Sequence, residues 1–152
     1  MPIEACYMKR IVLFLLASLI VYATFFTEKD RLDREVKRLC AIDGGIKVYE
    51  TVKLPVERFE KDGSIYIPSK QMVKPNHEYY YESSQQFLIK GNPSMWRNHY
   101  AVYRKSDNKL IGESSSYSRH GGDIPGPWHG SSFRCPVKAD ITDLNMQIFI
   151  KE

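Results

Sequence analysis

The chain has 152 residues, a formal net charge of +4 and three cysteines. This length fits one domain, because domains commonly contain about 100–150 residues. Basic and acidic side chains are mixed along the chain, whereas nucleic-acid-binding domains normally concentrate their basic residues in a patch. The composition therefore gives no argument for a nucleic-acid partner, and we expect none; it is that of an ordinary globular protein.

The most specific feature is a sixteen-residue run without charge, residues 11–26 (IVLFLLASLIVYATFF), which follows Lys9 and Arg10. At about 1.5 Å per residue the run reaches roughly 24 Å, against about 30 Å for the hydrocarbon core of a bilayer. Signal-peptide cores have this length, but Phe25 and Phe26 suit the boundary of a membrane anchor. We expect residues 1–27 to be a transmembrane anchor or a cleaved signal peptide, and residues 11–27 to contact the membrane. The alternative is a buried core helix, which is rare in a domain this small.

The start of the chain bears on the direction of insertion. Met8, Lys9 and Arg10 stand directly before the apolar run, as in a bacterial export signal, so we expect translation to begin at Met8. The positive-inside rule favours the opposite orientation, because five basic residues follow the run closely and only two precede it. We nevertheless place residues 28–152 on the periplasmic or otherwise extracytoplasmic side, either anchored or secreted after cleavage.

The cysteines support this location. Cys6 precedes the apolar run, so Cys40 and Cys135 are the two that remain for the domain. A bond between them would close a loop of about 95 residues and contribute on the order of 4–5 kcal/mol. Such bonds persist in oxidising compartments. The alternative is two free buried thiols.

The remaining pattern predicts an α+β domain. Residues 28–41 read as a short amphipathic helix, which would continue the apolar helix if no cleavage occurs. Alternation predicts strands at residues 46–54, 64–67, 79–82, 86–90, 96–105, 109–117 and 144–150, with a hairpin turn at 106–108. Short polar turns between these segments favour a mainly antiparallel sheet with a helix over one face.

Residues 120–136 (HGGDIPGPWHGSSFRCP) interrupt this pattern with four glycines and three prolines. Proline lacks a ladder donor and glycine is entropically costly in a strand, so a long shaped loop is expected. Long loops in compact domains are often functional. We predict binding through this region, by Arg119, Asp123, Trp128 and His129. The alternative is that Trp128 folds back over a sheet edge.

Catalytic signatures are absent from the sequence: it has no phosphate-binding glycine loop, no Cys-x-x-Cys and no Gly-x-Ser-x-Gly. We therefore expect a non-enzymatic envelope domain that binds a protein or ligand, without a cofactor or a metal. A single-span accessory subunit of a membrane complex is one alternative. The other is a metal-assisted hydrolase using His120, Asp123 and His129, residue types that suit zinc but whose spacing matches no known motif.

Overall fold

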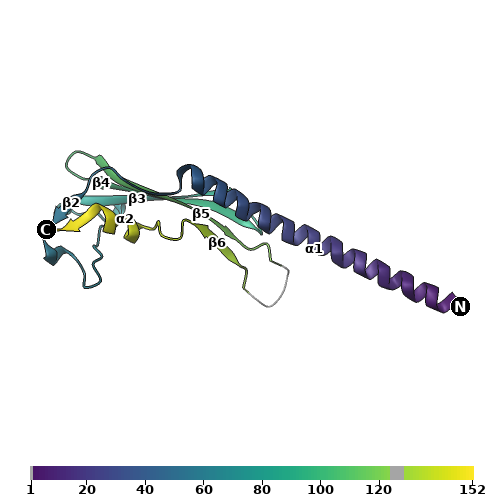
Figure 1. Cartoon of the computed structure of the whole chain (residues 1–152). Coiled ribbons are helices and arrows are strands. Elements are labelled where there is room, and N and C mark those ends of the chain that lie inside the picture. Colours follow the sequence, from purple (N-terminus) through teal and green to yellow (C-terminus); the bar gives the residue numbers. More distant parts are fainter. Residues whose placement is uncertain (1, 124–128) are drawn as a thin grey trace.

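The structure is a computed structural model that describes residues 2–123 and 129–152, apart from the side chains of residues 2–6 and 24–27. It confirms the α+β class, with a long N-terminal helix, a mainly antiparallel sheet and a short second helix (Figure 1). The helices and strands are α1 (Pro2–Asp43), β1 (Gly45–Val48), β2 (Val52–Leu54), β3 (Tyr79–Ile89), β4 (Ser94–Arg104), β5 (Lys109–His120), β6 (Ser132–Cys135), α2 (Ile141–Ile148) and β7 (Phe149–Lys151). Two short 3₁₀ turns, Val56–Arg58 and Lys70–Met72, interrupt the segment between β2 and β3.

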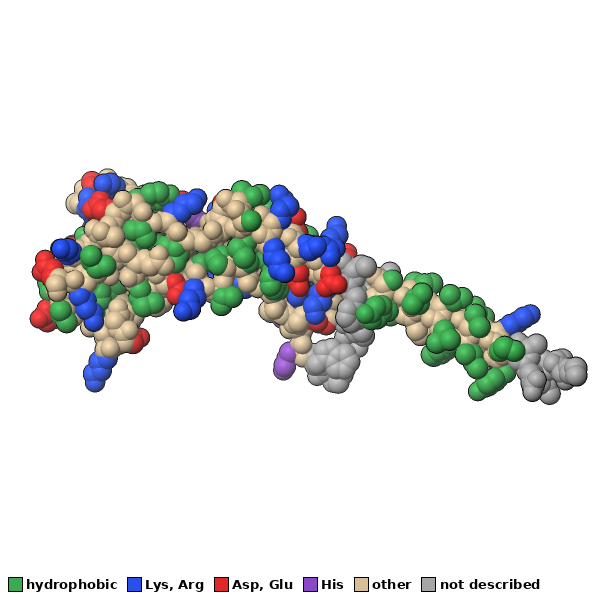
Figure 2. Space-filling model, viewed as in Figure 1, with side chains coloured by type: hydrophobic (Ala, Val, Ile, Leu, Met, Phe, Trp, Pro, Cys, Tyr) green, Lys and Arg blue, Asp and Glu red, His purple; other side chains and the backbone are tan. Residues whose placement is uncertain are grey.

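Helix α1 unites the apolar run and the amphipathic segment in one element of 42 residues. Its first half projects from the domain, and hydrophobic side chains surround it (Figure 2). This helix is long and apolar enough to cross a membrane. It ends at Asp43, directly before Gly44, where a Cβ atom would lie only 2.6 Å from the carbonyl oxygen of Cys40. A residue with a side chain cannot take that position without displacing the backbone, and the next residue, Gly45, takes a positive φ of 112° as the chain enters β1.

The main sheet has the order β1-β5-β4-β3, and β6 also pairs with β5. The predicted β4–β5 hairpin is confirmed, with Asn108 in the left-handed conformation at its turn (φ 53°). Strand β3 is one strand of eleven residues where the sequence predicted two short ones. Its middle is polar and exposed because β3 lies at the edge of the sheet, and this polarity concealed it from a search for apolar alternation.

Of the two strands predicted between residues 46 and 67, the first is divided into two and the second is wrong. Residues 46–54 form two strands, β1 and β2, that belong to different sheets. The chain leaves the main sheet at Tyr49 and Glu50, whose N–H groups both donate to the carbonyl of Ile111. Residues 64–67 form no strand, although Ile65 and Ile67 are buried in the core. Buried and exposed side chains therefore alternate in this segment although its backbone joins no sheet.

The predicted terminal strand at residues 144–150 is also wrong, because most of it forms α2. A capping box begins this helix, in which Asp140 accepts from the N–H of Asp143 and Asp143 accepts in return. Leu144 and Ile148 are spaced by four residues and both are fully buried. Because a spacing of four satisfies both a helix face and a strand face, alternation alone could not separate the two.

Two hydrophobic clusters pack against the sheet. Helix α1 covers one face, while α2 and the C-terminal segment lie against the other (Figure 1). The cluster under α1 contains Leu32, Val36, Met95 and Tyr117. The larger cluster, with α2, contains Leu54, Ile65, Ile67, Val102, Ile111, Leu144, Ile148 and Phe149. The end of α1 is thus part of the domain core, as the predicted covering helix requires.

Candidate functional site

The site that draws most of the predicted residues together is the junction of α1 with the sheet. We define the junction as the contacts that α1 makes with the end of β5, with β6 and with the described residues between them, 121–123 and 129–131. The α1 residues that take part recur at helical spacing on one face of α1: Lys29, Leu32, Asp33, Val36, Cys40 and Asp43. Two of them are apolar and four form ion pairs or a disulfide, so packing and polar contacts alternate along the helix.

Arg119 lies at the centre of the junction, with only 2% of its side chain exposed. Its Nε and Nη2 atoms donate to the two carboxylate oxygens of Asp33, at 2.7 and 3.1 Å. Its Nη1 donates to the carbonyls of Gly121 and Ser131, at 2.8 and 2.9 Å. One buried guanidinium therefore joins α1, the end of β5 and the residue before β6. A bidentate, charge-assisted contact of this kind fixes geometry as well as charge.

Asp123 forms a second ionic link to α1, through Lys29, which lies one helical turn closer to the apolar run than Asp33. It accepts a hydrogen bond from the Nζ of Lys29 at 2.7 Å and another from the backbone N–H of Ser131. The Lys29 ammonium, and next the Ser131 amide, hold the pKa of the Asp123 carboxyl well below its usual range. The carboxylate is therefore charged at neutral pH and spans the base of the loop.

The ion pair between Asp123 and Lys29 predicts that the stability of the fold depends on pH. The pKa of Asp123 is lower in the folded chain, so its ion pair stabilises the fold above the unfolded-state value of about 3.9 and loses this effect as pH falls. Asp123→Asn should be less stable than the parent at pH 7, and the difference should shrink below about pH 4. Urea unfolding of both proteins at pH 7 and pH 3 measures this. An equal difference at both values would show that the carboxylate charge does not contribute.

The predicted disulfide between Cys40 and Cys135 is confirmed. The two Cα atoms are 5.8 Å apart, a usual separation for a disulfide. Cys135 pairs with Tyr117 across β5 and β6, so the bond fastens the last turn of α1 to the sheet. With Arg119 and Asp123, the disulfide is the third covalent or ionic link between α1 and the loop region.

A polar network that the sequence reasoning missed extends from Asp43, the last residue of α1. Its carboxylate accepts from the hydroxyl of Tyr117 at 2.6 Å and from Arg97 at 2.9 Å. Burial alone would raise the pKa of Asp43, but Tyr117 and Arg97 outweigh it and lower the pKa. Arg97 also donates to Ser115, whose hydroxyl lies 3.1 Å from Nδ1 of His99.

The network has one acidic neighbour. Glu113 lies 3.8 Å from Nε2 of His99, so Ser115, His99 and Glu113 form a row on one face of β4 and β5. Burial, and next Arg97, lower the pKa of His99, which favours the neutral imidazole. Ser115 is buried and its hydroxyl already accepts from Arg97, so we assign this row to a structural role within the sheet. Polar residues at alternate positions of the predicted hairpin were the signal that could have revealed it.

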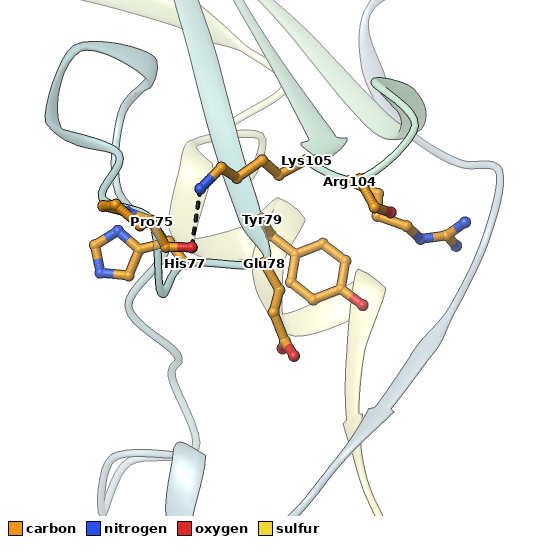
Figure 3. A pocket seen from close by; sticks show the side chains of 7 residues that line it. Pro75, His77, Glu78, Tyr79, Arg104 and Lys105 are labelled. Atoms are coloured by element: carbon orange, nitrogen blue, oxygen red, sulfur yellow. Dashed lines mark hydrogen bonds between the residues drawn. The ribbon is translucent and has the colours of Figure 1, made fainter.

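At the end of the sheet farthest from α1 is a cleft of about 490 Å³, lined by Pro75, His77, Glu78, Tyr79, Arg104, Lys105 and Ser106. Figure 3 shows Lys105 extended across it, and its Nζ donates to the carbonyls of Lys74 and Pro75. Arg104 is paired with Glu50 and Asp107. Both cations are thus used within the chain, and the carboxylate of Glu78 lies 3.9 Å from Arg58.

The other predicted residues lie as follows. His129 is exposed, and Nδ1 of the exposed His120 lies 2.9 Å from the hydroxyl of Ser132. Trp128 lies outside the described residues. Within residues 2–123 and 129–152, no group of three His, Cys, Asp or Glu side chains could hold a metal ion. The predicted loop at residues 120–136 is shorter than expected, because residues 132–135 form β6: Ser-Phe-Arg-Cys lies between Gly130 and Pro136, contains neither glycine nor proline, and can join the ladder.

The contacts of the junction hold α1 in place against the sheet. Arg119 and Asp123, predicted to bind a partner, hold the base of the loop against α1. Binding by His129 stays a prediction. Comparison of the chain with protein-family models, with curated proteins and with solved structures gives no match.

Proposed function

We propose that this chain is a single-span membrane protein whose domain, residues 28–152, lies outside the cytoplasm and binds another protein of the same membrane, without chemistry of its own. The observation that carries the proposal is the junction. An apolar helix enters the domain without a break and is fastened there by Arg119, Asp123 and Cys135. Such a connection holds a domain at a constant orientation to the bilayer, which suits assembly with a membrane partner.

The apolar half of α1 supports the same proposal. From Ile11 to Tyr22 its large apolar side chains are exposed on the isolated chain, and a membrane or other helices would cover them. A role as an accessory subunit of a membrane complex is therefore the specific form that we favour. The disulfide agrees with an oxidising compartment. The metal-assisted hydrolase receives less support, because Asp123 is occupied by Lys29 and Ser131.

The first expected result concerns topology. A reporter that is active only in the periplasm, fused after Glu152, should be active, and the fusion should stay in the membrane fraction at its uncleaved mass. The reason is that Lys9 and Arg10 precede the apolar run, which is long enough to direct export. The matched control lacks residues 1–27 and should be inactive. Activity of a cytoplasm-only reporter at the same position would contradict the proposed orientation.

A further inference from the structure

Strand β3 forms one edge of the main sheet, and half of that edge is closed by the chain itself. Near the start of β3, Ser69 forms a parallel bridge with Tyr81, and the Tyr81 N–H donates to the carbonyl of Pro68 at 3.0 Å. The chain then turns away at the 3₁₀ segment Lys70–Met72. Beyond this point no strand in the described part of the chain pairs with residues 83–87 on their outer side. We call residues 83–87 the open edge.

The direction of the backbone groups along the open edge follows from Tyr81. Its N–H points away from β4, and the β3–β4 register is regular from Tyr79 to Phe87. Because hydrogen-bonding groups alternate in direction along a strand, the N–H and C=O groups of Ser83, Gln85 and Phe87 also point outward. The open edge therefore offers three donors and three acceptors in the spacing of a sheet ladder.

The open edge lacks the usual protection of an edge strand. Its five residues, Ser-Ser-Gln-Gln-Phe, are all exposed and include no charge and no proline. Natural edges are normally blocked by lysine, proline, a bulge or a very short strand. Here the bulge comes only after Phe87, and Lys90 follows it. The opposite edge, β1, has four residues and carries Lys47. An unprotected edge of this kind is a template for strand addition.

We propose that the open edge binds an extended, uncharged segment of a different protein anchored in the same membrane. This inference rests on the proposed function and names the surface and the kind of partner. The segment would add as an outer strand beside β3. Its side chains on one face would meet Phe87, which lies against Trp96 with ring centroids 6.0 Å apart. On the other face they would meet Ser84 and Gln86, which are uncharged, and the nearest charges on that face, Arg97 and the Lys70–Glu82 pair, already have ionic partners.

The direction of the strands supports a partner from the same membrane. Helix α1 contacts Asp123 through Lys29 and, farther from the apolar run, Tyr117 through Asp43, so α1 runs antiparallel to β5. Strand β3 is parallel to β5, and Figure 1 shows the strands and α1 along one long axis. The open edge therefore runs along the direction of the membrane helix, with its Phe87 end toward the apolar run. A partner segment that leaves or enters the bilayer next to its own membrane span would run along the open edge in the same direction.

A second copy of this chain fits the open edge poorly. An antiparallel pair of β3 strands would place the two α1 helices at opposite ends, which cannot insert in the same face of one membrane. In a parallel pair of strands, the N–H and C=O groups of an outward-pointing residue bond to the residues before and after the one directly opposite it. Two identical strands in which the same residues point outward can therefore pair only when one is shifted by one residue along the other. That offset breaks two-fold symmetry, which most homodimers have. The geometry thus favours a different polypeptide.

The test uses the full chain in its own membrane, with a photo-crosslinking amino acid in place of Ser84. We expect an adduct with another membrane protein, at an uncharged segment within about ten residues of its membrane span, since about ten strand residues reach roughly 33 Å. Gln85→Pro removes an outward N–H without removing a bond to β4, so it should lower the adduct yield about tenfold. Gln85→Ala keeps that N–H and should leave the yield unchanged.

Further positions separate the two proposals. Crosslinkers at Arg34 and Val137, both exposed and away from β3, report other contacts. Adducts with a membrane protein there but none at Ser84 would overturn the open edge and leave the proposed function standing. No adduct at any position would contradict both. A Ser84 adduct that is insensitive to Gln85→Pro, or that joins two copies of this chain, would also overturn the inference. If Gln85→Pro unfolds the domain, Ser83→Pro, which removes the next outward N–H, repeats the test.

Discussion

Replacement of Arg119 by methionine is expected to lower the free energy of unfolding by about 3–5 kcal/mol. The side chain is nearly fully buried, and it is the partner of both Asp33 carboxylate oxygens and of the carbonyls of Gly121 and Ser131. Methionine fills a similar volume but donates no hydrogen bond. The variant would therefore leave a partly buried carboxylate and the Gly121 carbonyl without these partners, each with a desolvation cost, whereas the Ser131 carbonyl would keep the N–H of Gly121.

Denaturant unfolding of the full chain in detergent, followed by tryptophan fluorescence, measures this change. The double variant Arg119→Met with Asp33→Leu should recover part of the loss, because it removes the stranded carboxylate as well. Arg38→Met is the matched control, since Arg38 is an exposed arginine that pairs with Glu35 on its own helix. It should have no measurable effect. A loss below about 1 kcal/mol for Arg119→Met would mean that water replaces the guanidinium easily.

Either serine substitution at the disulfide is expected to cost roughly 2–5 kcal/mol, because the bond closes the long loop between α1 and β6. Cys40→Ser and Cys135→Ser remove the same constraint, so they should destabilise alike and the double variant should be no worse than either. Cys6→Ser should have no effect. Unfolding curves with and without reductant give the magnitude.

Peptide mapping without reductant tests the bond directly. Protein isolated from its own membrane should yield one linked peptide pair that contains Cys40 and Cys135. Two alkylatable thiols at these positions would contradict the bond and would remove its support for an oxidising compartment. The topology would then depend on the apolar segment alone, and the reporter fused after Glu152 would decide it.

Several features followed from local sequence, because neighbouring residues determine them. The apolar run of α1, the β4–β5 hairpin and the covering face formed by Leu32 and Val36 are patterns of hydrophobicity within a few turns or strands. The disulfide was also predictable, since only Cys40 and Cys135 lie beyond the apolar run. Counting identified this pair, and the contact of α1 with β6 decided between a bond and two free thiols.

Other features depended on contacts between distant parts of the chain. Arg119 and Asp123 were predicted as binding residues, but their ionic partners, Asp33 and Lys29, lie more than eighty positions earlier in the sequence. No local spacing indicates such a pairing. The segment around Leu144 was compatible with a strand and with a helix. The capping box at Asp140 and the buried space over the sheet decided for the helix.

The open edge of β3 likewise combines a feature that the local sequence determines with one that the tertiary structure determines. The sequence by itself determined that residues 83–87 are uncharged and free of proline. Only the tertiary structure decided that they form an edge strand, because an edge is defined by which strands are neighbours in the sheet. Residues 68–69 close the first half of that edge from a distance of about a dozen positions and leave the second half open. Backbone hydrogen bonds carry no side-chain signature, so their availability appears only when the strand order is known.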